Sequence, residues 1–279
     1  MHPTTARLGS LTVGSNIPAA VMGIINRDPN SFFHGSYYHT QKLAVAAAER
    51  MQVEQVDIID VGGASTAPGA PSVSVEVERE RVTTLIKELA SRWDTPISVD
   101  TQRSIVASEA IGQGASIVND VSGLKSDPQL AKTISDAGAS AVLMACSRQP
   151  GDCESIPTVC RALRGSLAIA SRAGISLKDI VVDPGIGFGK PTACDLSILR
   201  NLRKLRVLRR PILVSPSRKA FIGRVLGYPS PDSRLSGTLT AVAFALLQGA
   251  NVIRTHDVRD TRDCIRMLDA IQSNRECEL

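Results

Sequence analysis

The sequence predicts an α/β protein whose strands close into a (β/α)8 (TIM) barrel. Short apolar runs alternate with helical patterns about eight times, an order that is typical of parallel strands covered by helices. The runs are apolar at nearly every position, which indicates strands that are buried on both faces. The length of 279 residues is close to the ~250 residues that such a barrel typically needs. A doubly wound open sheet is the alternative.

The expected strands are marked by these apolar runs, and most of them finish in polar residues. With their polar ends they cover residues 22–26, 56–66, 97–101, 117–120, 141–146, 181–190, 211–219 and 251–257. In a barrel, the side chains at the carboxyl ends of the strands build the active site. The polar groups expected there are Asn26, Ser65, Thr66, Asp100, Asn119, Asp183, Ser217, Arg218, Lys219, Arg254 and His256.

Helical patterns fill the intervals between the expected strands. Apolar residues recur at helical spacing within 82–93 and 264–271. The stretch 239–247 is so apolar that it must be covered, either within the outer layer of the barrel or by a second subunit. The basic run 201–210 is expected to be a solvated helix face. Residues 8–14 are expected to form a small hairpin that plugs the barrel bottom.

The composition indicates a single globular domain that spans residues 1–279. With 43% hydrophobic and 21% charged residues, the chain has enough apolar material for one large core. The first 16 residues lack the apolar stretch of a signal peptide and no later run is long enough to cross a bilayer, so we expect a cytoplasmic protein. Only 3% of residues are aromatic, so the net charge of +5 suits a small anionic substrate better than nucleic acid.

The six cysteines show neither a CxxC pair nor an accompanying histidine cluster. We therefore expect reduced thiols and no zinc site. Cys146 falls at the end of an expected strand, but a nucleophilic cysteine needs a base, and no residue near it in the sequence supplies one.

The segment 181–190 carries the clearest ligand-binding pattern, because it places a carboxylate at the end of an apolar strand before a glycine-rich turn. Asp183 can accept two parallel hydrogen bonds from a flat donor edge, such as the N3–H and 2-amino group of a pterin. It can equally cap its own turn. Phe188 belongs either to the core or, as its place beside Asp183 favours, to a wall of the ligand pocket. Lys190 is equally compatible with a surface residue that closes the turn.

An ordered set of motifs between residues 21 and 268 resembles the dihydropteroate synthase family. Each motif is weak alone, whereas their order is highly specific. The motifs are 22–26 with 29–32, 57–63 with 65–66 and 68–69, 98–101, 119–123, 183–190, 217–219 with 221–223, and 254–257.

The resemblance implies a transferase of folate biosynthesis that joins 7,8-dihydropterin-6-ylmethyl diphosphate to 4-aminobenzoate, releasing diphosphate. Loss of diphosphate would leave a pterin-stabilised carbocation that the arylamine attacks. By the same resemblance, Asp100, Lys219 and Arg254 would be the catalytic residues, with Asp100 stabilising the cation electrostatically.

The resemblance also implies how each part of the substrates is held. The pterin would lie between Asp100, Asn119, Asp183 and Lys219, with the Arg254 guanidinium stacked on its ring. Mg²⁺ near Asn26 would bridge the diphosphate oxygens and make diphosphate a better leaving group. The full set of implied substrate contacts is Asn26, Thr66, Asp100, Asn119, Met144, Asp183, Phe188, Ser217, Lys219, Arg254 and His256.

Three departures from the family pattern fall on the loops and the rim. Ala67 stands where the family usually has an arginine, and Ala64 where it usually has a glutamate. The first loop gains Arg27 and His34, and the run 141–146 lacks the usual His-Met pair. We hypothesise that Arg27 replaces the cation that is missing at position 67.

Other functions stay open at this point. A related synthase of tetrahydromethanopterin synthesis couples the same pterin to an aminobenzene that carries a ribose phosphate. A pterin-binding methyltransferase domain is disfavoured by the Ser-Arg-Lys motif at 217–219 and the Arg-Thr-His motif at 254–256. A non-catalytic pterin-binding paralogue would be consistent with Ala67. Members of the resembled family tend to be homodimers, so we expect a homodimer here.

Overall fold

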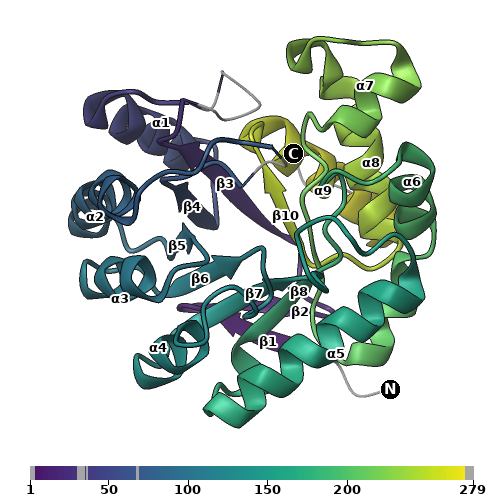
Figure 1. Cartoon of the computed structure of the whole chain (residues 1–279). Helices are drawn as coiled ribbons and strands as arrows, with labels where there is room; N and C mark the ends of the chain where they lie inside the picture. The colour runs from purple at the N-terminus through teal and green to yellow at the C-terminus, as the bar shows by residue number, and fades with distance from the viewer. Residues whose placement is uncertain (1–3, 30–34, 36, 67–68, 274–279) are drawn as a thin grey trace.

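The computed structural model of the protein describes residues 4–29, 35, 37–66 and 69–273. At its centre lies an eight-stranded sheet in the order β8-β7-β6-β5-β4-β3-β10-β9, with parallel neighbours throughout. An isolated parallel bridge between Val182 and Ile212 joins the outer strands and closes the barrel (Figure 1). The predicted closed barrel is therefore confirmed, and the open sheet is wrong. The strands are β3 (Ala20–Asn26), β4 (Ile58–Gly62), β5 (Ile97–Asp100), β6 (Ile117–Asp120), β7 (Ser140–Met144), β8 (Ile180–Asp183), β9 (Leu213–Val214) and β10 (Val252–Thr255).

Helices surround the strands on the outside of the barrel (Figure 1). The α-helices are α1 (Gln41–Val53), α2 (Val75–Arg92), α3 (Ser104–Gly112), α4 (Leu130–Asp136), α5 (Ile156–Ala173), α6 (Thr192–Arg200), α7 (Ala220–Leu226), α8 (Leu235–Leu247) and α9 (Val258–Ser273). Short 3-10 helices precede β8, β9 and α8, namely η2 (Leu177–Asp179), η3 (Leu202–Leu208) and η4 (Pro231–Arg234).

Strand alternation divides the apolar side chains between the barrel interior and the layer under the helices. In β3, Val21 and Ile25 pack in the helix layer, whereas Met22 packs in the interior. This is the period of two that a strand imposes on its side chains. Asn26, at the end of the same strand, therefore falls on the interior side, and Arg27 on the side of the helices.

The expected N-terminal hairpin closes the bottom of the barrel. Its strands β1 (Thr5–Leu8) and β2 (Leu11–Gly14) pair antiparallel, and Ala6, Leu8 and Val13 pack into the interior core. The prediction of a plug is confirmed, with a longer hairpin than expected. At the hairpin turn, Gly9 has φ +61°, and an added Cβ would lie 2.4 Å from Ser116 Oγ, so only glycine fits.

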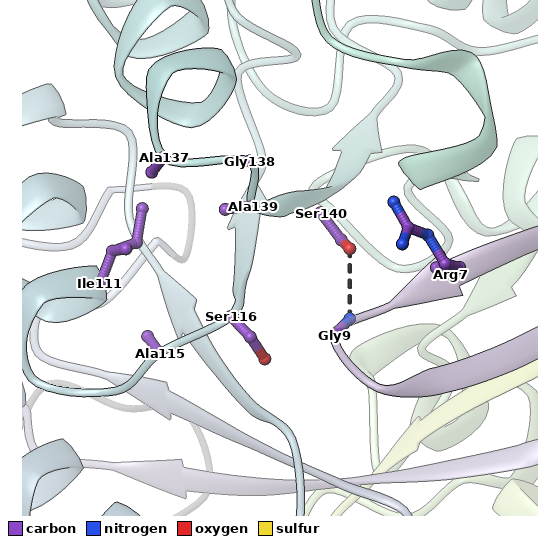
Figure 2. A pocket seen from close by; sticks show the side chains of 9 residues that line it. All are labelled: Arg7, Gly9, Ile111, Ala115, Ser116, Ala137, Gly138, Ala139 and Ser140. Carbon is purple, nitrogen blue, oxygen red and sulfur yellow. Dashed lines mark hydrogen bonds between the residues drawn. The ribbon is translucent and has the colours of Figure 1, made fainter.

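A shallow cavity of about 250 Å³ lies beside this hairpin turn, among the amino-terminal ends of the barrel strands (Figure 2). The Gly9 N–H donates to Ser140 Oγ at 3.1 Å, and Arg7 pairs with Asp179 at 2.8 Å. Small apolar side chains form most of the rest of the lining. Because these polar groups already have partners, the cavity is a gap in the packing of the plug.

The basic run 201–210 has the expected solvated helix face, but its helix is of the 3-10 type and not an α-helix. It forms the 3-10 helix η3, in which Leu202, Leu205 and Leu208 are buried. Apolar residues at every third position match the three residues per turn of a 3-10 helix, which explains the difference. The basic residues Arg203, Lys204 and Arg206 are exposed, so the solvated face is confirmed.

The apolar helix α8 is only partly covered by its own chain. Ala241, Val242 and Ala245 are buried, whereas Phe244 and Leu247 keep 39% and 44% of their surface exposed. Neither α8 nor any other helix in the described part of the chain is both long and apolar enough to cross a membrane.

Candidate active site

A cavity of about 500 Å³ opens at the carboxyl ends of the strands, opposite the hairpin plug. Of the predicted site residues, those that line it are Asn26, Thr66, Asp100, Phe188, Lys219, Arg254 and His256. The other four, Asn119, Met144, Asp183 and Ser217, are buried beside it. Seven of the eleven predicted residues thus line one cavity at the strand ends.

Arg254 is held between two carboxylates in the barrel interior. Its Nε donates to Asp60 Oδ2 at 2.6 Å, and its Nη2 donates to Asp100 Oδ2 at 2.9 Å. Asp60 Oδ2 also accepts a hydrogen bond from Asn119 Nδ2 at 3.2 Å. Asp60 thus connects Asn119, which is predicted to bind the pterin ring, to Arg254, which is predicted to stack on it. This carboxylate was missed by the sequence reasoning, although a charged residue in the middle of the apolar run 58–62 was a visible signal.

Asp100 keeps an acceptor available for a ligand. Its Oδ1 is buried and has no hydrogen-bond partner among the residues that the structure describes. Burial raises the pKa of Asp100 to about 7, although the Arg254 charge opposes this shift. A buried acceptor of this kind is costly unless a bound molecule satisfies it, which favours a ligand with N–H donors.

Asp183 caps its own turn with one oxygen, as the simpler interpretation predicted. Its Oδ1 accepts the Gly185 N–H at 2.7 Å. Burial raises the pKa of Asp183, while the Gly185 hydrogen bond and the Lys219 charge act in the opposite direction. The turn cap and the proposed ligand contact are compatible, because a carboxylate has two oxygens with about four acceptor positions.

Lys219 crosses the glycine-rich turn at close range. Its Nζ donates to the Ile186 carbonyl at 2.9 Å and lies 4.8 Å from the centre of the Phe188 ring. Gly187 has φ +70°, and an added Cβ would lie 2.3 Å from Lys219 Cδ, so the lysine stem fits only against glycine. Burial lowers the pKa of Lys219 to about 8, against the opposing charge of Asp183.

His256 is oriented by Ser217. The His256 backbone N–H donates to Ser217 Oγ at 3.2 Å, and Ser217 Oγ lies 2.9 Å from His256 Nδ1. The hydroxyl oxygen has a second lone pair and one hydrogen, so it accepts from Nδ1–H in one ring tautomer and donates to Nδ1 in the other. Burial and the nearby Arg254 charge lower the pKa of His256 well below its usual range, so the ring is neutral.

Two charged side chains of this region are far more buried than their positions in the sequence suggested. Lys190 keeps 2% of its surface exposed and donates to the Gly185 carbonyl, so it is not a surface residue. Asp195, which the sequence reasoning did not single out, keeps 1% exposed and accepts the Gly187 N–H at 2.8 Å. Its signal was a position in the first turn of the helix after the glycine-rich segment.

The positions that depart from the family pattern contribute little to the described lining. Ala64 lines the cavity, whereas His34 and Ala67 lie outside the described residues. Arg27 is not among the described lining residues, and its partly buried side chain lies within electrostatic range of Arg81 on α2. Since Arg27 follows Asn26 directly, strand alternation turns it away from the interior. The hypothesis that Arg27 replaces a missing phosphate ligand is not supported by this arrangement.

Cys146 does not have the properties of a nucleophile. It is buried, and burial raises the pKa of its thiol to about 11, so the reactive thiolate is disfavoured. The cysteines Cys146, Cys153, Cys160, Cys194 and Cys264 are free thiols, as expected. Among the described residues, no group of three or more histidine, cysteine, aspartate or glutamate side chains could hold a metal ion by itself.

Comparison with known sequences identifies relatives over most of the chain. A family model described as "Pterin binding enzyme" matches residues 22–256. The dihydropteroate synthase of Bacillus subtilis (strain 168) is 39% identical over 251 residues, covering 90% of this chain and 88% of the relative. The dihydropteroate synthase of Escherichia coli (strain K12) is 37% identical over 263 residues, covering 92% and 93%.

Comparison with solved structures identifies relatives of the same kind. A dihydropteroate synthase from Clostridium difficile, crystallised in the presence of pteroic acid, has a TM-score of 0.84 at 37% identity, covering 91% of this chain and 97% of that one. The Xanthomonas albilineans enzyme with 4-aminobenzoic acid has a TM-score of 0.88 at 35% identity, covering 97% and 99%. The likeness in sequence and in structure shows that the chain belongs to the dihydropteroate synthase family, the pterin-binding transferases of folate biosynthesis.

Proposed function

We propose that the cavity at the carboxyl ends of the strands condenses 7,8-dihydropterin-6-ylmethyl diphosphate with 4-aminobenzoate to give 7,8-dihydropteroate and diphosphate. The observation that carries this proposal is the array in which Asp60 and Asp100 hold Arg254 inside the barrel, with Asp100 Oδ1 left as a buried acceptor. A donor-rich flat ring would satisfy that acceptor. The relatives crystallised with pteroic acid and with 4-aminobenzoic acid support the same substrates.

The pterin ring would be recognised by polar groups from separate strands. Asp100, Asn119 and Asp183 offer carboxylate and amide groups that match the amino-pyrimidinone edge. Lys219 would donate to a ring acceptor, because its Nζ is buried next to the turn that follows Asp183. Arg254 would lie against the ring face, and its two carboxylate partners fix its orientation before the substrate arrives.

The diphosphate would lie near Asn26 and the neutral His256, which would donate to a phosphate oxygen through Nε2 in the tautomer that carries the proton there. The residues present also fit Mg²⁺. The ideal Cβ position at Gly62 lies 3.4 Å from Asn26 Oδ1 and 4.0 Å from Asp100 Oδ2, so an amide oxygen and a carboxylate oxygen lie near each other at the end of β4. Mg²⁺ typically uses one or two protein oxygens together with substrate phosphates. When bound, it would stabilise the charge of the departing diphosphate.

The arylamine would enter beside Phe188 and Thr66, which line the cavity. In the reaction, the bond between the pterin methylene carbon and the diphosphate oxygen breaks, and its electron pair leaves with diphosphate. Asp100, when ionised, stabilises the cation that remains on the pterin. The amine nitrogen then forms the new bond to the methylene carbon and releases its proton.

A coupled assay tests the reaction and its acceptor. Purified protein is supplied with the pterin diphosphate and either 4-aminobenzoate or an aminobenzene that carries a ribose phosphate. We expect 7,8-dihydropteroate from 4-aminobenzoate, at a kcat/KM at least tenfold above that of the ribosylated acceptor. Product from the ribosylated acceptor alone would identify the other synthase. Pterin binding without product from either acceptor would identify a non-catalytic paralogue.

The metal is tested separately from the pterin. Activity should require Mg²⁺, and Asn26→Ala should lower turnover while leaving the affinity for a pterin without diphosphate nearly unchanged. The physical reason is that Asn26 acts on the phosphates and the metal and does not contact the ring. Full activity in EDTA, or an equal loss of affinity for both pterins, contradicts this role.

A homodimer is the assembly that the surface favours. Phe244 and Leu247 on α8 expose 39% and 44% of their surface, and Met267 and Ile271 on the neighbouring α9 expose 63% and 64%. Apolar side chains exposed together on neighbouring helices are typical of a protein interface. We propose that α8 and α9 pack against a second copy of the chain.

A further inference from the structure

The turn 184–189 after β8 connects the proposed pterin anchor, Asp183, to the proposed arylamine wall, Phe188. Two ionic side chains, Lys190 and Asp195, bond to the backbone of this turn and also line the cavity, and the reaction described above assigns no step to either. Lys190 and Asp195 keep 2% and 1% of their surface exposed, which is unusual for charged residues. Each of them bonds to a different peptide group of the turn.

Lys190 acts on the pterin end of the turn. Its Nζ donates to the carbonyl of Gly185, and the N–H of the same residue donates to Asp183 Oδ1 at 2.7 Å. A single residue therefore carries both the bond that orients the anchor carboxylate and the bond from the lysine. Gly185 has φ +73°, a left-handed conformation that glycine adopts without strain.

Asp195 acts on the arylamine end of the turn. Its Oδ1 accepts the N–H of Gly187 at 2.8 Å, directly before Phe188. On the other side of Gly187 runs the stem of Lys219, with no space for a side chain in between. A small shift of Gly187 would therefore displace the Phe188 ring relative to Lys219, which lies over it.

The opposite charges of these two residues explain how both can be buried. Burial lowers the pKa of Lys190 and raises the pKa of Asp195, and in each case the charge of the other residue opposes the shift. A buried charge persists only where an opposite charge and hydrogen bonds compensate its lost hydration.

We propose that Lys190 and Asp195 are positioning residues with separable effects, Lys190 serving the pterin through Asp183 and Asp195 serving the arylamine through Phe188. The proposal rests on the roles assigned above to Asp183 and Phe188. Both residues act through the backbone of the turn and neither takes part in the chemistry. The consequence is that the affinities for the two substrates are set by different bonds within one turn.

Steady-state kinetics with each substrate varied in turn test this separation. Lys190→Met keeps an unbranched side chain, one atom shorter, and removes its donor, so it should raise the KM for the pterin diphosphate about tenfold or more. Its KM for 4-aminobenzoate should stay within about twofold of the unmodified protein. Asp195→Leu should raise the KM for 4-aminobenzoate about tenfold or more and leave the KM for the pterin diphosphate within about twofold. Asp195→Asn keeps an acceptor oxygen for the Gly187 N–H and should restore the KM for 4-aminobenzoate.

Matched controls separate positioning from stability. Lys125→Met removes another partly buried lysine. Lys125 lies in the loop after β6, and its Nζ donates to Ser166 Oγ on α5 at 2.7 Å. Asp179→Asn removes a buried carboxylate at the opposite end of the barrel, where it pairs with Arg7. Both should leave the two KM values within about twofold. If Lys190→Met does not fold, Lys190→Leu, which also lacks a donor, takes its place, and the Asp195 series tests the other half independently.

The outcomes distinguish this inference from the assignment of the site. If Asp183→Asn abolishes pterin binding while Lys190→Met and Asp195→Leu raise both KM values equally, the separation is wrong and the pterin site stands. If neither variant changes a KM, the positioning roles are wrong. If Asp183→Asn leaves pterin binding unchanged, the proposed function itself fails.

Discussion

Asp100 is the residue whose chemistry is most changed by its surroundings. It lies within a group of buried charges, and the nearby charge of Asp60 adds to the effect of burial in raising its pKa to about 7. Lys219, across the same cavity, has its pKa lowered to about 8. The pKa of the Asp100 carboxyl is thus raised, and the pKa of the Lys219 ammonium lowered, toward neutral pH. Such shifts are typical of groups that act in catalysis.

These shifts predict a bell-shaped pH profile of kcat/KM. Asp100 must be ionised to stabilise the cation, so activity should rise as pH increases through about 7. Lys219 must be charged to hold the pterin, so activity should fall as pH increases through about 8. Asp60→Asn removes a negative charge that raises the pKa of Asp100, so the rising limb should move to lower pH. Initial rates measured across pH check this, and a rising limb that stays in place contradicts the coupling.

The pterin anchor gives a second prediction at the residue scale. Asp183→Asn should abolish detectable pterin binding while the fold stays intact. The amide can turn only one acceptor toward the ligand, so a donor meets a donor, at a cost of about 1–3 kcal/mol or more in a buried site. Calorimetric titration with a pterin diphosphate analogue measures the affinity, and circular dichroism confirms the fold. Unchanged affinity would refute the assignment.

At the scale of elements, an ion pair ties the loop after β9 to the start of α9. Arg218 Nε and Nη2 bond the two oxygens of Asp257 at 2.9 and 2.7 Å, and Arg218 Nη1 donates to the carbonyls of Pro231 and Asp232 in η4. The two charged side chains keep only 11% and 12% of their surface exposed. This arrangement places the neighbouring Ser217 and Lys219 in the site without requiring Arg218 to touch a substrate.

Arg218→Met should therefore lower the free energy of unfolding by about 3 kcal/mol or more, because it leaves the Asp257 carboxylate nearly buried without its partner. Urea-induced unfolding measures this loss. The exposed pair of Lys132 and Asp136, at 68% and 62% exposure, is the control, and Lys132→Met should cost less than about 0.5 kcal/mol. Equal losses in the two variants would show that the buried pair has no special structural role.

At the scale of the whole molecule, the exposed apolar residues of α8 and α9 predict assembly. Sedimentation equilibrium should give twice the mass of one chain. Phe244→Glu combined with Met267→Glu should give monomers, because a buried interface would then contain two unpaired charges per subunit. Val53→Glu, at an apolar position on α1 that is 78% exposed, should leave the dimer intact. A monomeric unmodified protein would contradict the proposed interface.

The barrel itself was largely predictable from the sequence, because it follows from local patterns. Strands buried on both faces need continuous apolar runs, and a run that ends in Asn26 or Asp100 places that polar residue at the carboxyl edge whatever its neighbours are. The same reasoning brought together the predicted residues around the cavity. The same reasoning did not predict the position of Arg27. A shift of one position along the strand turns a side chain from the interior to the helix layer.

The sequence by itself determined the alternation of strands and helices, the face on which the site lies, and the family. Tertiary structure alone decided which charges meet. Asp60 in β4 and Arg254 in β10 are 194 residues apart in the chain, yet Arg254 Nε lies 2.6 Å from Asp60 Oδ2. Lys190 is buried because the turn above it folds back on its Nζ. Such pairings depend on the closure and register of the sheet, and no local pattern encodes these, because closure is a property of all the strands together.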